Sequence, residues 1–205
     1  IAQIESNIAF TDCTSRKDIN NGIYKIDYDG FNGVLEPIDE YCNYVDGISN
    51  LNKFKLDIQS QGYNNGNTSF VRVNGYNLSH GRGHGLFVFN KKLELVYQAR
   101  YDTYGDPNSD NRFINDLNDL SKTPLNSLIV ITVVDSAEIY RDHGSTVNAK
   151  TTCSLSASLS HRQGYICIAY RNSLNQRIKI YENRGASLRT IQYIDYTDFY
   201  NHLTP

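Results

Sequence analysis

The residues best suited to chemistry lie in one short stretch, HGRGHGLFVFN, from His80 to Asn90. Arg82 and His84 alternate with glycines at 81, 83 and 85, and an apolar run follows directly. Glycine accepts irregular backbone angles and lets another group approach closely. A guanidinium donates charge-assisted hydrogen bonds to carboxylates and hydroxyl oxygens. We therefore expect a strand that is entered beside a ligand, with Arg82 as a polar contact.

Other patterns for chemistry are missing from the sequence. None of the five histidines accompanies the G-x-S-x-G elbow of a hydrolase. His80 and His84 have a four-residue spacing that can hold zinc on a helix, but the glycines beside them oppose a helix. The chain has no phosphate-binding loop or dinucleotide fingerprint, and the acids between Tyr101 and Asp110 lack the spacing of a calcium loop. We expect no enzymatic activity, no metal and no cofactor.

The composition limits the kinds of partner that the protein can bind. The 205 residues are 40% hydrophobic, which is enough to bury a core, and no apolar run of about 18 residues is present to span a bilayer. The formal net charge is -2, and the 20 Lys and Arg residues are scattered along the chain. Because nucleic-acid binding needs a concentrated basic surface, we expect neither a nucleic-acid partner nor a membrane span.

The cysteines fall in two well-separated pairs, which are Cys13, Cys42, Cys153 and Cys167. Local pairing would join the first to the second and the third to the fourth, although three connectivities are possible. Two glycosylation sequons, at Asn67 and Asn77, lie in turn-rich sequence. Together with an isoleucine in place of a start methionine, these features favour a mature, secreted, extracellular glycoprotein.

The chain from residue 52 onward has the pattern of a β-rich domain. Alternating segments enriched in β-branched and aromatic residues predict strands at 54–58, 69–76, 85–90, 93–101, 165–171, 176–182 and 188–194. The segment 127–134, SLIVITVV, is apolar throughout and predicts a central strand covered on both faces. Asn90 to Lys92 predicts a hairpin turn between two of these strands.

One helix is predicted, between Asp110 and Ser121, with Ser109 or Asp110 as its N-cap. A helix that leads directly into a buried strand indicates an α+β sandwich with few helices covering a mixed sheet. The preceding segment, from Cys13 to about Asn50, is rich in Asn, Asp, Gly and Tyr and predicts a small, disulfide-dependent lobe. We therefore divide the chain into domains at 1–51 and 52–205.

The order of the motifs also resembles a known family. GRGHGLFVFN, YDTYGD, a helix, SLIVITVVDSAE and HRQGYICIAYRN together resemble the interleukin-like EMT inducer domain, also called the PANDER-like or GG domain, over about residues 52–198. The resemblance implies a compact β-β-α sandwich in a secreted protein without established catalytic apparatus. Some members act as cytokine-like signals, and one copy binds glycan for a separate catalytic domain.

The first domain is similar to a different family. Cys13, NGIYKI and PIDEYCNYVDG follow the order of the opening subdomain of fibrinogen-related domains, without the Gly-Gly-Trp that normally follows. This resemblance implies a cap closed by a disulfide between Cys13 and Cys42.

Three residues match the sugar contacts of the glycan-binding copy. Arg82 stands in the G-R-G motif, Asp135 ends the apolar strand, and Arg162 matches the arginine of a W-R-D motif. His161 replaces the tryptophan of that motif and Gln163 replaces its aspartate. The chemistry suits a sugar, whose vicinal hydroxyls donate to a carboxylate and accept from a guanidinium. The alternative is a structural ion pair in which the two arginines clamp the aspartate.

Two functions from different classes follow. The first is a lectin-like module in which His161 or Tyr165 stacks on a pyranose, in a homo-oligomer that makes weak single sites multivalent. The second is a cytokine-like or structural extracellular protein that acts through protein-protein contacts or self-assembly at strand edges or a Tyr-rich surface.

Overall fold

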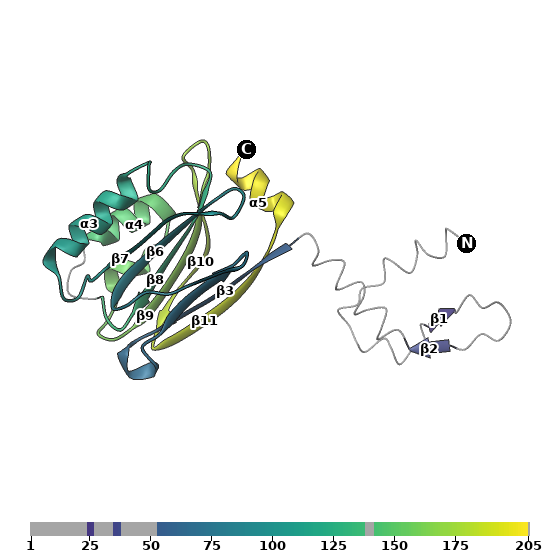
Figure 1. The fold of residues 1–205 in the computed structure, drawn as a ribbon, viewed down its shortest axis with the longest axis horizontal. Helices are drawn as coiled ribbons and strands as arrows, with labels where there is room; N and C mark the ends of the chain where they lie inside the picture. The colour runs from purple at the N-terminus through teal and green to yellow at the C-terminus, as the bar shows by residue number, and fades with distance from the viewer. Residues whose placement is uncertain (1–23, 27–34, 38–52, 138–141, 205) are drawn as a thin grey trace. The chain divides into compact units, whose positions relative to one another are not determined.

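The computed structural model describes residues 24–26, 35–37, 53–137 and 142–204 (Figure 1). The chain separates into two units, Ile1–Lys53 and Phe54–Pro205. In the first unit, β1 (Tyr24–Ile26) and β2 (Leu35–Pro37) pair antiparallel. The expected bridge between Cys13 and Cys42 lies outside the described residues.

The second unit is an α+β fold of two antiparallel sheets and three α-helices. The five-stranded sheet has the order β10-β9-β8-β6-β7 and consists of β6 (Gly83–Asn90), β7 (Leu95–Tyr101), β8 (Ser127–Val134), β9 (Gly164–Arg171) and β10 (Arg177–Gly185). The four-stranded sheet has the order β11-β3-β4-β5 and consists of β3 (Lys53–Gln61), β4 (Ser69–Val73), β5 (Tyr76–Leu78) and β11 (Ser187–Asp195).

The expectation of mixed sheets is wrong. Sequence neighbours such as β6 and β7, or β9 and β10, are joined by short hairpins, which force antiparallel pairing. The connection from β7 to β8 carries a helix but still returns to an antiparallel position beside β6. In the described part of the chain, parallel pairing occurs as an isolated bridge between Gly62 and Asp135.

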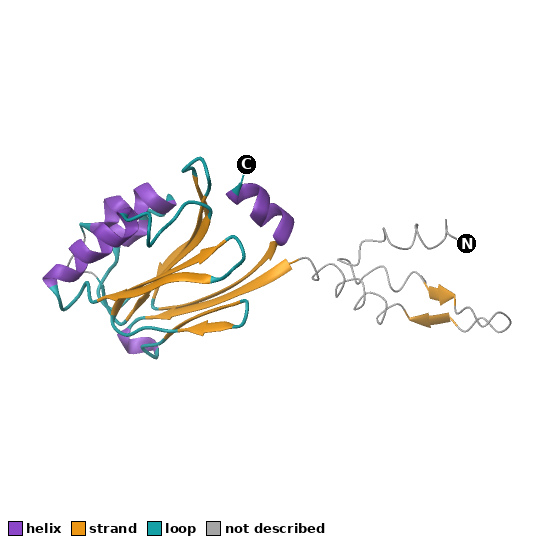
Figure 2. Ribbon diagram, turned by 45° about the horizontal axis from the view of Figure 1, so that its top comes forward, coloured by secondary structure: helices purple, strands orange, loops and turns teal. Residues whose placement is uncertain are grey.

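The five-stranded sheet is the middle layer of the unit (Figure 2). Along β8, Leu128 and Val130 pack toward the four-stranded sheet, whereas Ile129 and Ile131 pack toward the helices. Every residue of β8 is buried, which confirms the central strand that its continuous apolar run predicts. The sheet therefore separates two hydrophobic cores, one on each of its faces.

The one predicted helix begins and ends at different residues from those expected. The bounds are α3 (Pro107–Asn118), α4 (His143–Thr151) and α5 (Tyr196–Leu203). The first of these begins earlier than expected because Asp106 is its N-cap, accepting a hydrogen bond from the Asn108 backbone N–H at 2.9 Å, and Pro107 occupies the first turn. The other two helices lie in polar or tyrosine-rich sequence and were not predicted. A short 3-10 helix, η3 (Leu155–Ser158), follows α4.

One predicted strand is two strands. Asn74 and Gly75 have φ angles of 46° and 82°, as a two-residue type I′ turn requires. They divide the segment 69–76 between β4 and β5, with Val73 opposite Tyr76. The hairpin expected at Asn90 to Lys92 is confirmed, since it joins β6 and β7.

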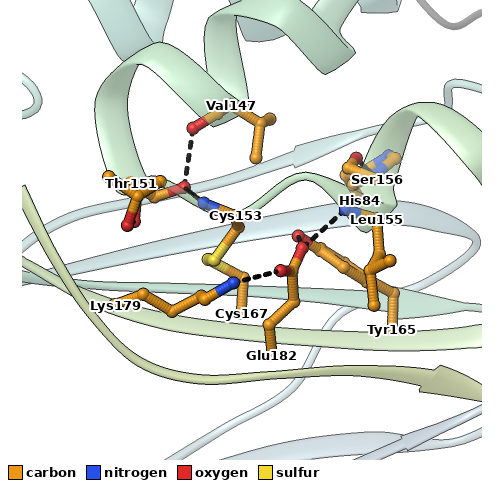
Figure 3. The surroundings of a disulfide bond; sticks show 11 residues. His84, Val147, Thr151, Cys153, Leu155, Ser156, Tyr165, Cys167, Lys179 and Glu182 are labelled. Carbon is orange, nitrogen blue, oxygen red and sulfur yellow. Dashed lines mark hydrogen bonds and ion pairs between the residues drawn. A yellow bond between two sulfur atoms is a disulfide. The ribbon is translucent and has the colours of Figure 1, made fainter.

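A disulfide joins Cys153, just after α4, to Cys167 in β9 (Figure 3). This confirms the local pairing of the last two cysteines. Both residues are fully buried on the helix side of the five-stranded sheet. The bridge therefore fixes the segment after α4 onto the middle layer.

Candidate functional site

The sheet topology brings the three predicted contact residues to one end of the five-stranded sheet. Arg82 directly precedes β6, Asp135 directly follows β8, and Arg162 lies two residues before β9. In the ladders Gly83 lies opposite Val134, and Val133 lies opposite Tyr165. Because β8 lies between the other two strands, the aspartate leaves the sheet between the two arginines.

Arg82 is bound by an acid that the sequence did not single out. Its Nε donates to Asp102 Oδ1 at 3.0 Å, and its Nη2 donates to Asp102 Oδ2 at 2.7 Å. Arg100 Nη2 adds a longer bond of 3.4 Å to the same carboxylate. The fork from Arg82 lowers the pKa of Asp102. The available signal was YDTYGD, which follows the strand that pairs with β6.

Asp135 presents its carboxylate beside these groups. Its backbone is in the left-handed region, with φ 67°, and is held by hydrogen bonds from its own N–H to Gln61 O and from Tyr63 N–H to its carbonyl, both at 3.2 Å. Its residue is partly exposed, and among the described residues no donor bonds its carboxylate. The pKa of Arg82 is raised chiefly by the bond to Asp102, with a smaller contribution from the charge of Asp135.

Arg162 lies on the neighbouring turn and is exposed. Its backbone N–H donates to Ser136 Oγ at 3.2 Å, and its Nη1 donates to Asn64 Oδ1 at 3.2 Å. The guanidinium carbon lies 4.6 Å from the centre of the Tyr63 ring, a cation–π contact. Tyr63 and Asn64 belong to η2 (Tyr63–Asn65), so this short turn is an unpredicted part of the site.

The direct clamp of Asp135 by two arginines is not among the contacts of the described residues. Arg82 is bound to Asp102 and Arg162 to Asn64. The structure thus brings the three predicted residues to one sheet end without joining them in an ion pair, and each arginine has a different partner that fixes its position.

The aromatic rings of this region differ from those expected. Tyr104 lies beneath Arg82, at 5.3 Å from the guanidinium carbon to the ring centre, and 6.0 Å from the ring of His161. Tyr63 is 51% exposed. Tyr165, by contrast, is fully buried on the helix side, where its hydroxyl donates to Glu182 Oε1 at 3.0 Å (Figure 3). We therefore leave Tyr165 out of the candidate surface and include Tyr63 and Tyr104.

Two glycines of HGRGHG are required by contacts within the protein. Gly83 has φ +96°, and a Cβ there would lie 2.0 Å from the carbonyl oxygen of Tyr101. A Cβ at Gly85 would lie 2.4 Å from the ring of His80. That ring fills the space over the strand and makes a 2.7 Å hydrogen bond with Thr132 Oγ1. These glycines therefore admit parts of the protein itself, where the sequence predicted the approach of a ligand.

A second polar cluster lies buried between α3, α4 and the sheet. The Asp110 carboxylate bonds His143 Nδ1, and His143 Nε2 lies 3.0 Å from Ser156 Oγ, in the order acid, imidazole, hydroxyl. His84 Nε2 lies 3.2 Å from the same hydroxyl and its Nδ1 lies 2.8 Å from Thr103 Oγ1. Sequence patterns alone did not find this set.

One assignment of protons satisfies the whole cluster. His143 Nδ1–H donates to Asp110, and the Ser156 hydroxyl donates to His143 Nε2. His84 then donates from Nε2–H to Ser156 Oγ, and its Nδ1 accepts from the Thr103 hydroxyl. Burial, together with the nearby His143, lowers the pKa of His84 well below its ordinary value. Ser156 is only 1% exposed, so its hydroxyl is closed off from solvent, and the cluster joins the helices to the sheet.

Further features bear on the remaining expectations. Within the ranges that the structure describes, no group of three or more His, Cys, Asp or Glu side chains is placed to hold a metal ion. No described helix is long and apolar enough to cross a membrane. Both sequon asparagines, Asn67 and Asn77, are exposed.

A scan against models of protein families and a search of curated proteins found no match to this chain.

Proposed function

We propose that the protein is a secreted, non-catalytic, lectin-like module that binds a glycan at the sheet end formed by Arg82, Asp135 and Arg162. The observation that carries this proposal is the partly exposed Asp135 carboxylate, which accepts no hydrogen bond from the described residues while an arginine is fixed on either side of it. The layer order, with a four-stranded sheet, a five-stranded sheet and helices, is consistent with the β-β-α sandwich of the family that the sequence resembles.

The chemistry of the site suits a hexose. Vicinal hydroxyls of a sugar donate to a carboxylate such as that of Asp135, and the unused guanidinium hydrogens of Arg162 donate to the hydroxyl oxygens. The exposed ring of Tyr63 provides an apolar face for the C–H side of a pyranose. Because the arginines are already positioned by protein partners, little side-chain entropy is lost on binding.

A glycan array tests the proposal. The native protein, Arg162→Ala and the control Lys91→Ala are compared, since Lys91 is an exposed cation in the β6–β7 hairpin, at the opposite end of β6 from Arg82. We expect Arg162→Ala to abolish binding to the recognised glycan without lowering the thermal midpoint, and the control to bind like the native protein. Equal binding by all three proteins, or no glycan bound at any density, contradicts the proposal.

A second function is favoured by a different surface. Edge strand β11 exposes Ile191 by 43% and Tyr193 by 59% on the same face, which is typical of strands that pair with another protein or with a second copy. In this alternative the protein is cytokine-like or structural. Sedimentation of the native protein and of Ile191→Thr with Tyr193→Thr separates the two, because only self-assembly through β11 predicts a smaller assembly for the variant.

A further inference from the structure

The outer face of the four-stranded sheet carries a basic groove that the proposed sugar site does not use. The inner face of this sheet packs on the middle layer, and helices α3 and α4 cover the opposite side of that layer (Figure 2). The groove is shallow and open, with a volume of about 570 Å³. Its charged lining residues are Lys55, Asp57 and Arg72, and Arg189 of β11 lies at the same acid.

The one carboxylate among the lining residues of the groove, that of Asp57, is already neutralised. Arg189 donates from Nε and Nη2 to the two oxygens of Asp57, both at 3.0 Å, and this fork lowers the pKa of Asp57. Asp57 is only 5% exposed. The cations Lys55, Arg72 and Arg189 thus face one acid, so the groove keeps a formal excess of two positive charges.

Arg72 is held ready for a ligand. Its Nε donates to Asn77 Oδ1 at 3.1 Å, and its guanidinium carbon lies 4.0 Å above the centre of the Phe70 ring. Its Nη1 lies at 4.0 Å from Asp57, and half of the side chain is exposed. Among the described residues the terminal nitrogens donate no hydrogen bond, and Nη1 makes only the long ion pair with Asp57, so both can donate to an incoming anion from an orientation fixed in advance. Lys55, two residues before Asp57 on the same strand face, adds an exposed ammonium.

The far end of the groove is open. Gly75, in the turn between β4 and β5, has no atom within 4 Å of the position that a Cβ would take. Asn74 and Tyr76 flank this glycine and line the groove. Amide and phenol groups at this end can bond hydroxyls, while the charge is concentrated at Lys55 and Arg72.

We propose that this groove binds an acidic polysaccharide, with a sulfate or carboxylate group held between Lys55 and Arg72. The groove offers cationic donors for one anionic group, and neutral polar groups follow them. An acidic sugar chain has the matching order, with an anionic group beside neutral hydroxyls. A nucleic acid is disfavoured because it presents phosphates in close succession, whereas this chain has a net charge of -2 and its bases are scattered. The groove shares no residue with the sheet end of Arg82, Asp135 and Arg162, so it does not rest on the function proposed above.

Binding of a fluorescent, sulfated octasaccharide to the full chain tests this proposal. Lys55→Gln and Arg72→Gln are each expected to weaken binding about tenfold, the loss of one charge-assisted hydrogen bond. The control Arg112→Gln, which removes an exposed charge from α3 on the opposite side of the middle layer, is expected to stay within about twofold of the native protein, a small effect of a distant, screened charge. Arg162→Ala is expected to bind like the native protein, which keeps this test independent of the other site.

Two further arms assign the anion and the class of ligand. A desulfated octasaccharide that keeps its carboxylates distinguishes uronate from sulfate, and binding of either one supports the proposal. Because Asn77 belongs to a sequon and lines the groove, binding is measured before and after enzymatic removal of glycans. The proposal is overturned if neither oligosaccharide binds, if the Lys55 and Arg72 variants bind like the control, or if a single-stranded oligonucleotide competes equally well.

Discussion

Loss of the Cys153–Cys167 bridge is predicted to destabilise the second unit by about 3 kcal/mol. The two cysteines are separated by 14 positions, so their bond closes a short loop. In the loop-entropy model a loop of roughly 15 residues restricts the unfolded chain by about 3 kcal/mol at 25 °C. The sulfurs are fully buried, and the Cys153 backbone N–H is fixed by Thr151 Oγ1 at 3.1 Å (Figure 3). We therefore expect the packing around the two cysteines to persist after reduction.

The measurement is urea unfolding of oxidised and reduced protein, followed by far-UV circular dichroism. Both samples carry Cys13→Ser and Cys42→Ser, so that only one bridge is compared. With a urea slope of about 2 kcal/mol per M, the midpoint of the reduced protein is expected about 1.5 M lower. A midpoint difference below about 0.5 M, or free thiols at these positions in protein purified without reductant, would refute the reasoning.

The remaining predictions concern the start of β6 and the residues that contact it, with Gly75 as a comparison. Gly83→Ala is expected to cost more than about 3 kcal/mol, because the new Cβ meets the Tyr101 carbonyl, whereas Gly75→Ala, also at positive φ but in open space, costs only about 1 kcal/mol; equal losses in urea unfolding would contradict this. Burial lowers the pKa of His80 from 6.5 to about 4, so the unfolded chain binds the proton first, and stability is lost as the pH falls from about 6.5 to about 4. His80→Gln should remove about 3 kcal/mol of this pH dependence, and an unchanged slope of unfolding free energy against pH would count against it. Asp102→Asn should lower the thermal midpoint by about 3 °C, since it weakens a partly exposed fork worth about 1 kcal/mol; calorimetry checks this, and an unchanged midpoint speaks against the fork.

The sequence predicted the strands well because the burial of a strand produces a local pattern of apolar residues. The run 127–134 matches β8 at both ends, since a strand buried on both faces needs apolar residues throughout. A strand that is buried on both faces also conceals which face each side chain occupies, and the sequence therefore did not show that Tyr165 points toward the helices. In β9 every residue is buried, so no alternation of polar and apolar residues reveals which face a side chain occupies.

Parts of the candidate site depend on contacts between distant segments. Asp102 becomes the partner of Arg82 only through the β6–β7 register, and Tyr63 reaches Arg162 across about 100 residues of chain. Helix α4 was missed because its buried face includes the polar His143, whose partner Asp110 lies on another helix. Such pairs leave no spacing signal in a single sequence, whereas the positions of Arg82, Asp135 and Arg162 at strand ends were predictable.

The central claim is that a glycan binds at the sheet end of Arg82, Asp135 and Arg162. Chemical-shift mapping of backbone amides in isotope-labelled protein, titrated with the glycan that the array selects, tests it most directly. Binding there predicts shifts concentrated at Tyr63, Asn64, Asp135 and Arg162, and their disappearance in Asp135→Asn. Shifts confined to other faces of the molecule, or a titration that Asp135→Asn leaves unchanged, would contradict it.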